Sequence, residues 1–216
     1  MGVATFAMVE LEADDGLASA ARLAADNADV AKVCIWTPDK DLAQCVVDDR
    51  VVQVDRKTNA IRNADEVKKK FGVDAAHIPD YLALVGDAAD GYPGIAGIGA
   101  VGAARLLNRH GPIEAFPPEV LGERRKQALL FKQLATLRTD APVYRRVDEL
   151  RWRGPRSEFA AWAERWFNTT ATLRPSTRKD YEVLLNNRAL PGFGGTTLVA
   201  IDALAVREWV AELVAS

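Results

Sequence analysis

The stretch "GDAADGYPGIAGIGAVGAARLL" (Gly86–Leu107) places six glycines and two carboxylates, Asp87 and Asp90, ahead of an apolar helical pattern. Glycine allows a backbone to approach a ligand closely, and a Gly-Ile-Gly turn before a helix directs free N–H groups toward a phosphate. A glycine-rich turn between two helices is the simpler interpretation. A dinucleotide-binding fingerprint is disfavoured because no clear strand directly precedes the glycines.

The residues before this stretch alternate between strand and helix patterns. They predict strands at 3–9 and 32–36, helices at 14–28 and 64–72, and a small hairpin within 50–63. The pattern then becomes helical. Strand–helix–strand order predicts an α/β fold with a sheet that is at least partly parallel.

The composition is that of an ordinary globular protein. The chain has 216 residues, is 49% hydrophobic and 27% charged, and carries a net charge of -2, so any nucleic-acid contact must come from local patches. Cys34 and Cys45 lie among apolar residues, which predicts buried free thiols. We expect a cytoplasmic protein without a membrane partner, because no apolar run or signal peptide is apparent.

Carboxylates recur where the predicted strands end and in the loops that follow. They are Glu12, Asp14, Asp15, Asp39, Asp41, Asp87 and Asp90. Loops at the carboxyl ends of parallel strands converge, and carboxylates gathered there repel each other unless cations bind them. Oxygen ligands suit Mg²⁺ or Mn²⁺, and two such ions about 4 Å apart can hydrolyse a phosphodiester. Taken singly, each acid has a simpler role as a loop cap or a partner of a helix dipole.

Three motifs together resemble the 5′-nuclease family. They are "ELEADD", "WTPDKDLAQCV" and "IPDYLALVGDAADGYPGIAGIGAVGAARLL". That family comprises the 5′-3′ exonuclease domain of bacterial DNA polymerase I, its stand-alone relatives and flap endonucleases. The resemblance covers about residues 3–160. It implies a partial 5′-nuclease (PIN-like) α/β sheet with a helix–hairpin–helix (helix-three-turn-helix) region over 78–107, which grips duplex DNA, usually with a monovalent cation such as K⁺.

The resemblance also assigns roles to residues. All seven carboxylates fall on metal-ligand positions of the family, and four of them are assigned to catalysis: Asp39, Asp41, Asp87 and Asp90. The implied DNA-contacting residues are Lys40, Gly97, Ile98, Gly99, Gly102 and Arg105. The implied activity is metal-dependent hydrolysis of phosphodiester bonds in a DNA duplex that has a 5′ end or flap.

Two departures from the family pattern stand out. Gly91 replaces the usual Asn after the second acid of the glycine-rich motif. The family's first strand, its two carboxylates and its helical arch have no counterpart, because Met1 stands just before "ELEADD". We therefore expect the front half to be absent or supplied by another chain. Unpaired sheet edges and exposed apolar surface would then make the isolated chain poorly stable or prone to aggregate.

The C-terminal part carries a second resemblance. "LRPSTRKDY", "LPGFGG" and "VREWVAEL" are similar to the core-binding (SAM-like) domain of tyrosine recombinases, the phage integrases, over residues 158–216. The resemblance implies a small all-α domain that clamps DNA, after a nuclease domain at 1–157. A hydroxyl-plus-basic helix start predicts phosphate contacts at Ser176, Thr177, Arg178 and Lys179. The simpler alternative is a helical tail anchored by its tryptophans, Trp162, Trp166 and Trp209.

Three function hypotheses follow from the sequence. The first is a metal-dependent 5′-3′ exonuclease or flap nuclease. The second is a non-catalytic DNA-binding remnant of such a nuclease, fused to an integrase-type clamp. The third and weakest is a nucleotide-binding α/β protein that uses the glycine stretch and binds no DNA.

Overall fold

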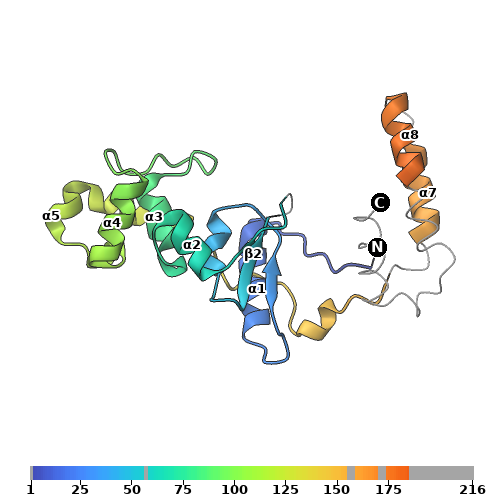
Figure 1. Cartoon of the computed structure of the whole chain (residues 1–216), viewed down its shortest axis with the longest axis horizontal. Helices are drawn as coiled ribbons and strands as arrows, with labels where there is room; N and C mark the ends of the chain where they lie inside the picture. Colours follow the sequence, from blue (N-terminus) through green and yellow to red (C-terminus); the bar gives the residue numbers. More distant parts are fainter. Residues whose placement is uncertain (1, 56–57, 155–158, 170–173, 185–216) are drawn as a thin grey trace. The chain divides into compact units, whose positions relative to one another are not determined.

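The computed structural model describes residues 2–55, 58–154, 159–169 and 174–184 (Figure 1). The chain forms two compact units. One is Phe6–Val147, and the other combines Met1–Thr5 with Asp148–Ser216. Within the described residues, every helix is too short or too polar to cross a lipid bilayer.

A small three-stranded sheet lies in the Phe6–Val147 unit. Its strands are β1 (Val33–Ile35), β2 (Val51–Val54) and β3 (Ile61–Arg62), in the order β1-β2-β3. β1 pairs with β2 in parallel, and β2 pairs with β3 as an antiparallel hairpin. All four residues of the central strand β2 are buried. The predicted mixed α/β architecture with a partly parallel sheet is confirmed.

Helices make up most of this unit. They are α1 (Ala13–Ala25), α2 (Ala64–Phe71), α3 (Ile78–Val85), α4 (Ala100–His110), α5 (Pro118–Leu121) and α6 (Arg125–Ala135). Short 3₁₀ turns separate them: η1 (Asp41–Cys45), η2 (Ala75–His77), η3 (Ile113–Ala115) and η4 (Gly122–Arg124). In Figure 1, α1 lies beside the sheet and α2 to α5 lie together; α6 packs into the same core as these helices.

The main hydrophobic core is built around α3. Leu82, Leu84, Leu107 and Ile113 are almost completely buried, and they bring α3, α4 and η3 together. Helix α3 is apolar along most of its length, and seven of its eight residues are buried. A helix that is apolar all round belongs in a core, which explains its central position.

Local signals set the bounds of α2. The Asn63 side chain accepts a hydrogen bond from the amide of Glu66 at 3.1 Å and so caps the first turn. Gly72 ends the helix with a φ of 76°, a left-handed conformation that favours glycine. The helix predicted at 64–72 is confirmed.

The other unit contains η5 (Val147–Leu150) at its boundary, α7 (Phe159–Thr169) and α8 (Pro175–Leu184). Ala163 on α7 is buried. The helix start that the sequence predicts around Ser176 is present in α8, which begins at Pro175. The motifs "LPGFGG" and "VREWVAEL", with Trp209, lie outside the described residues.

Two predictions about local structure are wrong. Residues 3–9 form no strand. A strand needs a neighbour for its backbone N–H and C=O groups, and within the described residues β1 pairs only with β2. Val3 and Val9 are instead exposed. Cys34 is also exposed, because side chains alternate along β1 and Ile35 is the residue that faces the core. Cys45 is half-buried, and both thiols are free.

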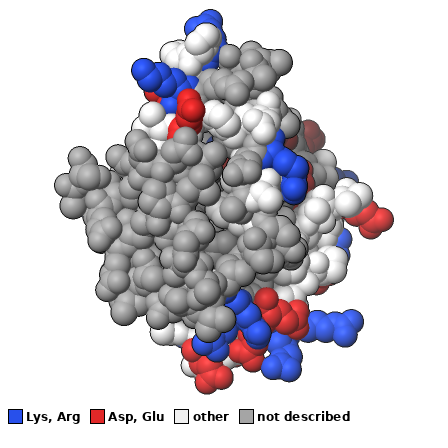
Figure 2. Space-filling view, turned by 90° about the vertical axis from the view of Figure 1, so that its right-hand side faces the viewer, with Lys and Arg blue, Asp and Glu red and all other residues white. Residues whose placement is uncertain are grey.

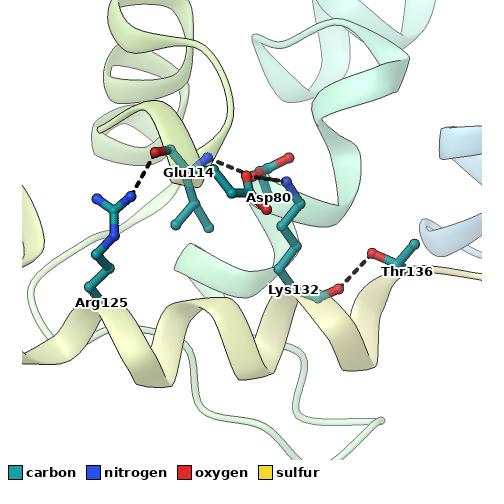
Figure 3. A network of polar contacts seen from close by, with 6 residues as sticks. Asp80, Glu114, Arg125, Lys132 and Thr136 are labelled. Atoms are coloured by element: carbon teal, nitrogen blue, oxygen red, sulfur yellow. Dashed lines mark hydrogen bonds and ion pairs between the residues drawn. The ribbon is translucent and has the colours of Figure 1, made fainter. Parts of the chain in front are cut away.

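A buried ion pair joins α3 to α6 (Figure 3). The Asp80 carboxylate is 1% exposed and accepts hydrogen bonds from the Ile113 amide at 2.8 Å and from Lys132 Nζ at 2.9 Å. Lys132 Nζ also lies 2.7 Å from Glu114 Oε2. Burial by itself lowers the pKa of Lys132, but its hydrogen bonds to Glu114 and Asp80 outweigh this effect and raise it. The pair thereby ties the start of α3 to α6 and η3.

Removal of this lysine should destabilise the fold. We expect Lys132→Met to lower the free energy of unfolding by roughly 3 kcal/mol, because the Asp80 carboxylate would stay buried without its cation. Urea unfolding followed by circular dichroism measures the change. Lys126→Met, on the exposed face of the same helix, is the matched control. Equal stability of the two variants would contradict this role of the ion pair.

Candidate metal centre

The loop after α3 folds back on itself and carries two of the predicted carboxylates. The backbones of Asp87 and Tyr92 exchange two hydrogen bonds, of 2.8 and 3.0 Å, and the Ile95 amide donates to the Leu84 carbonyl at 2.8 Å. These bonds close a narrow loop directly at the C-terminal end of α3. The loop thereby fixes where the side chains of Asp87 and Asp90 lie.

Two glycines allow this loop to close. Gly86 and Gly94 have φ angles of 93° and 74°, and their backbones face each other. A Cβ on Gly94 would lie 2.5 Å from the Gly86 nitrogen, and one on Gly86 would lie 2.5 Å from the Pro93 carbonyl carbon. Only glycine fits both positions. Part of the glycine-rich pattern therefore serves the geometry of the acidic loop.

Three carboxylates converge at this loop. Asp41 is the first residue of η1, and oxygens of Asp41, Asp87 and Asp90 lie within 4.8 Å of one another. Asp41 is 8% exposed and Asp87 is 3% exposed, whereas Asp90 is exposed to solvent. Two buried carboxylates and one exposed carboxylate thus form a cup that opens to the surface.

The electrostatics of the cup disfavour full ionisation when no cation is bound. Burial, a hydrogen bond to Asp90 and the charges of Asp90 and Asp39 raise the pKa of Asp41 to about 8. Within the described residues, Asp41 Oδ1 is buried without a hydrogen-bond partner. Within the same residues, the Tyr92 hydroxyl is also buried without a hydrogen-bond partner. The pKa of Tyr92 is raised, mainly by burial and to a smaller extent by the charge of the nearby Asp41.

The donor set fits a hard divalent cation. Carboxylate oxygens are the ligands that Mg²⁺, Mn²⁺ and Ca²⁺ prefer, and the cup offers three of them. The orphaned Asp41 oxygen is costly unless something binds it, and a cation would remove that cost. The residues present therefore satisfy the chemistry of a divalent-metal site.

Lys40 supplies a positive charge at the cup. Its Nζ lies 2.7 Å from Asp87 Oδ2. Burial by itself lowers the pKa of Lys40, but the hydrogen bond and the charge of Asp87 outweigh this effect and raise it. The lysine thus points at a buried carboxylate of the cup.

The other four predicted carboxylates lie outside the cup, in two different situations. Asp14 is half-buried in the first turn of α1, and its pKa is raised by burial and then by the charges of Asp39, Glu12 and Asp90. Asp39 is exposed, and its Oδ1 accepts from the Asp41 amide at 3.4 Å. Asp14 and Asp39 therefore lie in the field of the cup without joining it.

Asp15 and Glu12 take part in local structure at the start of α1. Asp15 Oδ1 accepts from the Arg138 amide at 2.8 Å, and Asp15 Oδ2 accepts from the Glu12 amide at 3.2 Å. Glu12 is the N-cap residue of α1 and is exposed. Both oxygens of Asp15 are thus occupied by backbone N–H groups, a role that the acidic pattern alone did not reveal.

The predicted glycine hairpin forms a tight turn ahead of α4. The Ile98 amide donates to the Ile95 carbonyl at 3.0 Å, Gly97 has a φ of 82°, and Gly99 is the N-cap residue of α4. A Cβ on Gly97 or Gly99 would meet open space. Ile98 is half-buried and packs on the main core. The glycines are therefore accessible while the isoleucine anchors the turn.

The remaining candidate DNA contacts lie on two helices. On α4, Arg105 is exposed and Gly102 is half-buried next to Ile98. The α8 candidates belong to the other compact unit. Ser176 and Lys179 are exposed there, Thr177 is half-buried, and Arg178 lies in the same helix.

Two glutamines support the cup, and the sequence pattern did not single them out. Gln44 Nε2 donates to the carbonyls of Asp41 and Ala135, at 2.9 and 3.0 Å, and so ties η1 to the end of α6. Gln53, buried on β2, donates to the Asp39 carbonyl. Gln53 could have been noticed in the sequence, because it is the one polar residue in the otherwise apolar strand "VVQV".

Charges of both signs lie close together on the described part of one face of the protein. In Figure 2, blue Lys and Arg side chains and red Asp and Glu side chains lie next to each other at the upper and lower margins of the face shown. This mixture agrees with the net charge of -2. Any attraction for a polyanion must therefore arise locally rather than from the protein as a whole.

The fold and the cup define an α/β protein with a cluster of carboxylates whose chemistry fits a divalent cation. The sequence matches models of three known protein domains. Residues 1–72 match the "5'-3' exonuclease, N-terminal resolvase-like domain", and residues 73–158 match the "5'-3' exonuclease, C-terminal SAM fold". Over residues 1–158 the chain belongs to the 5′-3′ exonuclease family. Residues 158–214 match the "Phage integrase, N-terminal SAM-like domain".

Individual relatives agree with this assignment. DNA polymerase I of Pseudomonas aeruginosa is 36% identical over 170 residues, which cover 69% of this chain and 18% of the polymerase. A 5′-3′ exonuclease of Aquifex aeolicus is 33% identical over 161 residues, which cover 71% of this chain and 55% of the relative. The chain thus spans about half of the exonuclease relative and a smaller share of the polymerase.

A solved structure shares the fold. It is the flap endonuclease of bacteriophage T5 in a complex with DNA and metal ions. The TM-score is 0.50 at 20% identity, and the match covers 61% of this chain and 49% of that protein.

A methyl group at Gly94 should disrupt the acidic loop. We expect Gly94→Ala to cost roughly 3 kcal/mol or more, because it adds a backbone clash to the strain of a positive φ. We also expect weaker Mn²⁺ binding. Urea unfolding and calorimetric titration measure the two effects. Gly111→Ala is the control, since Gly111 has a φ of 77° but no atom near its Cβ position. A Gly94→Ala variant as stable as Gly111→Ala would refute the close-contact argument.

The raised pKa of Asp41 should make the stability of the folded protein depend on pH. Folding raises the pKa of Asp41 from 3.8 to about 8, so between these values the unfolded chain binds fewer protons than the folded protein. The contribution of Asp41 to stability is therefore present below about pH 4 and is lost as the pH rises toward about 8. Mg²⁺ should raise the Tm more at about pH 8 than at about pH 5, since the ion and the proton compete.

Scanning calorimetry with chelator and with Mg²⁺ makes this comparison. Asp41→Asn should remove both the pH-dependent loss and most of the Mg²⁺ effect. If the Asn variant kept the same Mg²⁺ response, another site would be responsible.

Proposed function

We propose that residues 1–158 act as a metal-dependent 5′-3′ exonuclease or flap nuclease that hydrolyses phosphodiester bonds near a 5′ end of duplex DNA, with Mg²⁺ or Mn²⁺. The observation that carries this proposal is the buried, unpartnered Asp41 oxygen beside Asp87 and Asp90. Family membership over the same residues supports it. The free thiols Cys34 and Cys45 favour a reducing, cytoplasmic setting.

The three carboxylates of the cup would hold one divalent ion from different sides. When bound, a divalent ion acts as a Lewis acid and lowers the pKa of a coordinated water. Asp41 and Asp87 would hold it from the buried side, and Asp90 from the solvent side. Asp39 and Asp14 lie near enough for their charges to act on carboxylates of this site. The resemblance assigns Asp39 to the same ion, and assigns Glu12, Asp14 and Asp15 to a second ion or to a bridge between the two.

Of the three acids at the start of α1, we assign Asp14 to that second role. Asp14 lies in the field of the cup, whereas both oxygens of Asp15 already accept backbone N–H groups. Completion of a two-ion site by ligands of a second chain, as the resemblance suggests, is part of this proposal.

DNA would be held by the turn ahead of α4. Gly97 and Gly99 leave space for a phosphate backbone, and a K⁺ ion bound to backbone carbonyls at this turn would strengthen the contact. Gly102 keeps the first turn of the helix free of a bulky side chain, and Arg105 adds a positive charge one turn further on. These contacts are independent of base sequence, which suits a nuclease that recognises the form of its substrate.

A second candidate function rests on the match of residues 158–214 to the phage integrase SAM-like domain. The chain would then be a DNA-binding protein in which α8, with Ser176 and Lys179 exposed, adds phosphate contacts to those of the glycine turn. In this alternative the carboxylate cup would not support cleavage. Binding without metal-dependent hydrolysis distinguishes it from the nuclease.

Cleavage of a 5′-labelled flap duplex tests the proposed function. We expect product with Mg²⁺ or Mn²⁺ and none with chelator. Asp41→Ala should reduce cleavage at least about a hundredfold, because a buried ligand is lost, and leave duplex binding within about twofold. Asp65→Ala, an exposed acid at the start of α2, is the control that should cleave normally. Undiminished cleavage by Asp41→Ala would refute the site, and salt-sensitive binding without any cleavage would favour the second candidate.

The contribution of Arg105 can be read from the salt dependence of DNA binding. Loss of one phosphate contact in Arg105→Ala should lower the slope of log K against log[salt] by about one, with little change between DNA sequences. Fluorescence anisotropy over a series of KCl concentrations measures the slope. Lys126→Ala, which removes a charge from α6, should leave it unchanged. Equal slopes for wild type and Arg105→Ala would remove this residue from the interface.

A further inference from the structure

Lys40 occupies an unusual position in the carboxylate cup. Its Nζ lies 2.7 Å from Asp87 Oδ2, and that carboxylate is 3% exposed. Asp41 Oδ1, in the same cup, is buried and unpartnered within the described residues. The ammonium group therefore contacts one of the three carboxylates that would hold a cation, whereas Oδ1 of another, Asp41, has no hydrogen-bond partner among the described residues.

The charges explain why a lysine is placed there. Three carboxylates whose oxygens approach within 4.8 Å repel each other strongly where water is excluded. A positive charge next to Asp87 offsets part of that repulsion when no metal ion is bound. Since a divalent cation bound in the cup would need the same buried oxygens, the ammonium group and the cation compete for Asp87.

We propose that Lys40 is an internal counter-ion, which stabilises the metal-free cup and is displaced from Asp87 when a divalent cation binds to Asp41, Asp87 and Asp90. This inference rests on the metal site of the proposed function. Lys40 would act in this way before it contacts DNA. Its ion pair with Asp87 supplies, in the metal-free protein, part of the positive charge that the bound cation supplies later.

The side chain of Lys40 can make this change without a rearrangement of the backbone. It is 39% exposed, and its flexible four-carbon stem allows the charged head to turn into solvent. The displaced ammonium group is then free to bind a phosphate of DNA. Metal binding would in this way prepare Lys40 for a phosphate contact, so the contact with Asp87 and the contact with DNA occur in sequence.

Metal affinity tests the competition directly. We expect Lys40→Met to bind Mn²⁺ about tenfold more tightly than wild type in calorimetric titration, on the scale of one hydrogen bond to a charged group. Lys40→Arg keeps the charge and should stay within about threefold of wild type. Lys68→Met is the matched control, because Lys68 Nζ pairs with Asp74 at 3.0 Å on the exposed surface. Unchanged or weaker Mn²⁺ binding by Lys40→Met would overturn the proposal.

Thermal stability provides a readout that is independent of affinity. In chelator, Lys40→Met should lower the Tm by about 2–4 °C, since Asp87 loses its counter-ion. In saturating Mg²⁺ the difference should vanish, because the cation takes over that role. A residue that served only packing would lower the Tm equally under both conditions, and this result would also overturn the proposal.

A nuclear magnetic resonance experiment follows the displacement itself. The side-chain ammonium signal of Lys40 should show slow hydrogen exchange in chelator and lose that protection on addition of Mg²⁺. A signal that stays protected at saturation would contradict displacement. If these changes occur in a protein that does not cleave DNA, the nuclease proposal fails and the counter-ion role stands. If wild type binds neither Mn²⁺ nor Mg²⁺, both fail.

Discussion

Repulsion between buried carboxylates is the constraint on which the site depends. Asp41 and Asp87 are buried close to Asp90, an arrangement that opposes folding unless a proton on Asp41 or a nearby positive charge compensates it. The chain holds them together through backbone contacts, chiefly the paired hydrogen bonds between Asp87 and Tyr92. The backbone of this loop thus keeps the three carboxylates together despite their repulsion, in a shape that would suit a cation.

The core places that loop through a single helix. Helix α3 is buried almost throughout, and Asp80 fixes its start to Lys132 of α6. Its other end leads directly into Gly86 and the acidic loop. Gln44 joins the turn that carries Asp41 to the end of α6 as well. Both arms of the cup are therefore tied to α6, the turn with Asp41 through Gln44 and the acidic loop through α3. Packing outside the cup thus sets the positions of its carboxylates.

Much of this organisation was predictable, because it follows from local chemistry. Asn63 and Gly72 mark the ends of a helix by capping rules, and the acids that follow the strands point to a cation site. Contacts between distant residues were not predictable in the same way. Residues 3–9 have a strand pattern but no strand to pair with in the described structure. The tight contact that requires Gly94, and the direction in which Lys40 points, depend on tertiary packing that residue types do not encode.

The central claim is that Asp41, Asp87 and Asp90 bind one divalent cation. The most direct measurement is anomalous diffraction from crystals of the protein soaked with Mn²⁺. The account predicts an anomalous peak about 2.1 Å from an oxygen of each of the three carboxylates, with the Lys40 ammonium group away from Asp87. A well-occupied peak elsewhere, or a cup in which Lys40 still contacts Asp87 at saturating Mn²⁺, would contradict it.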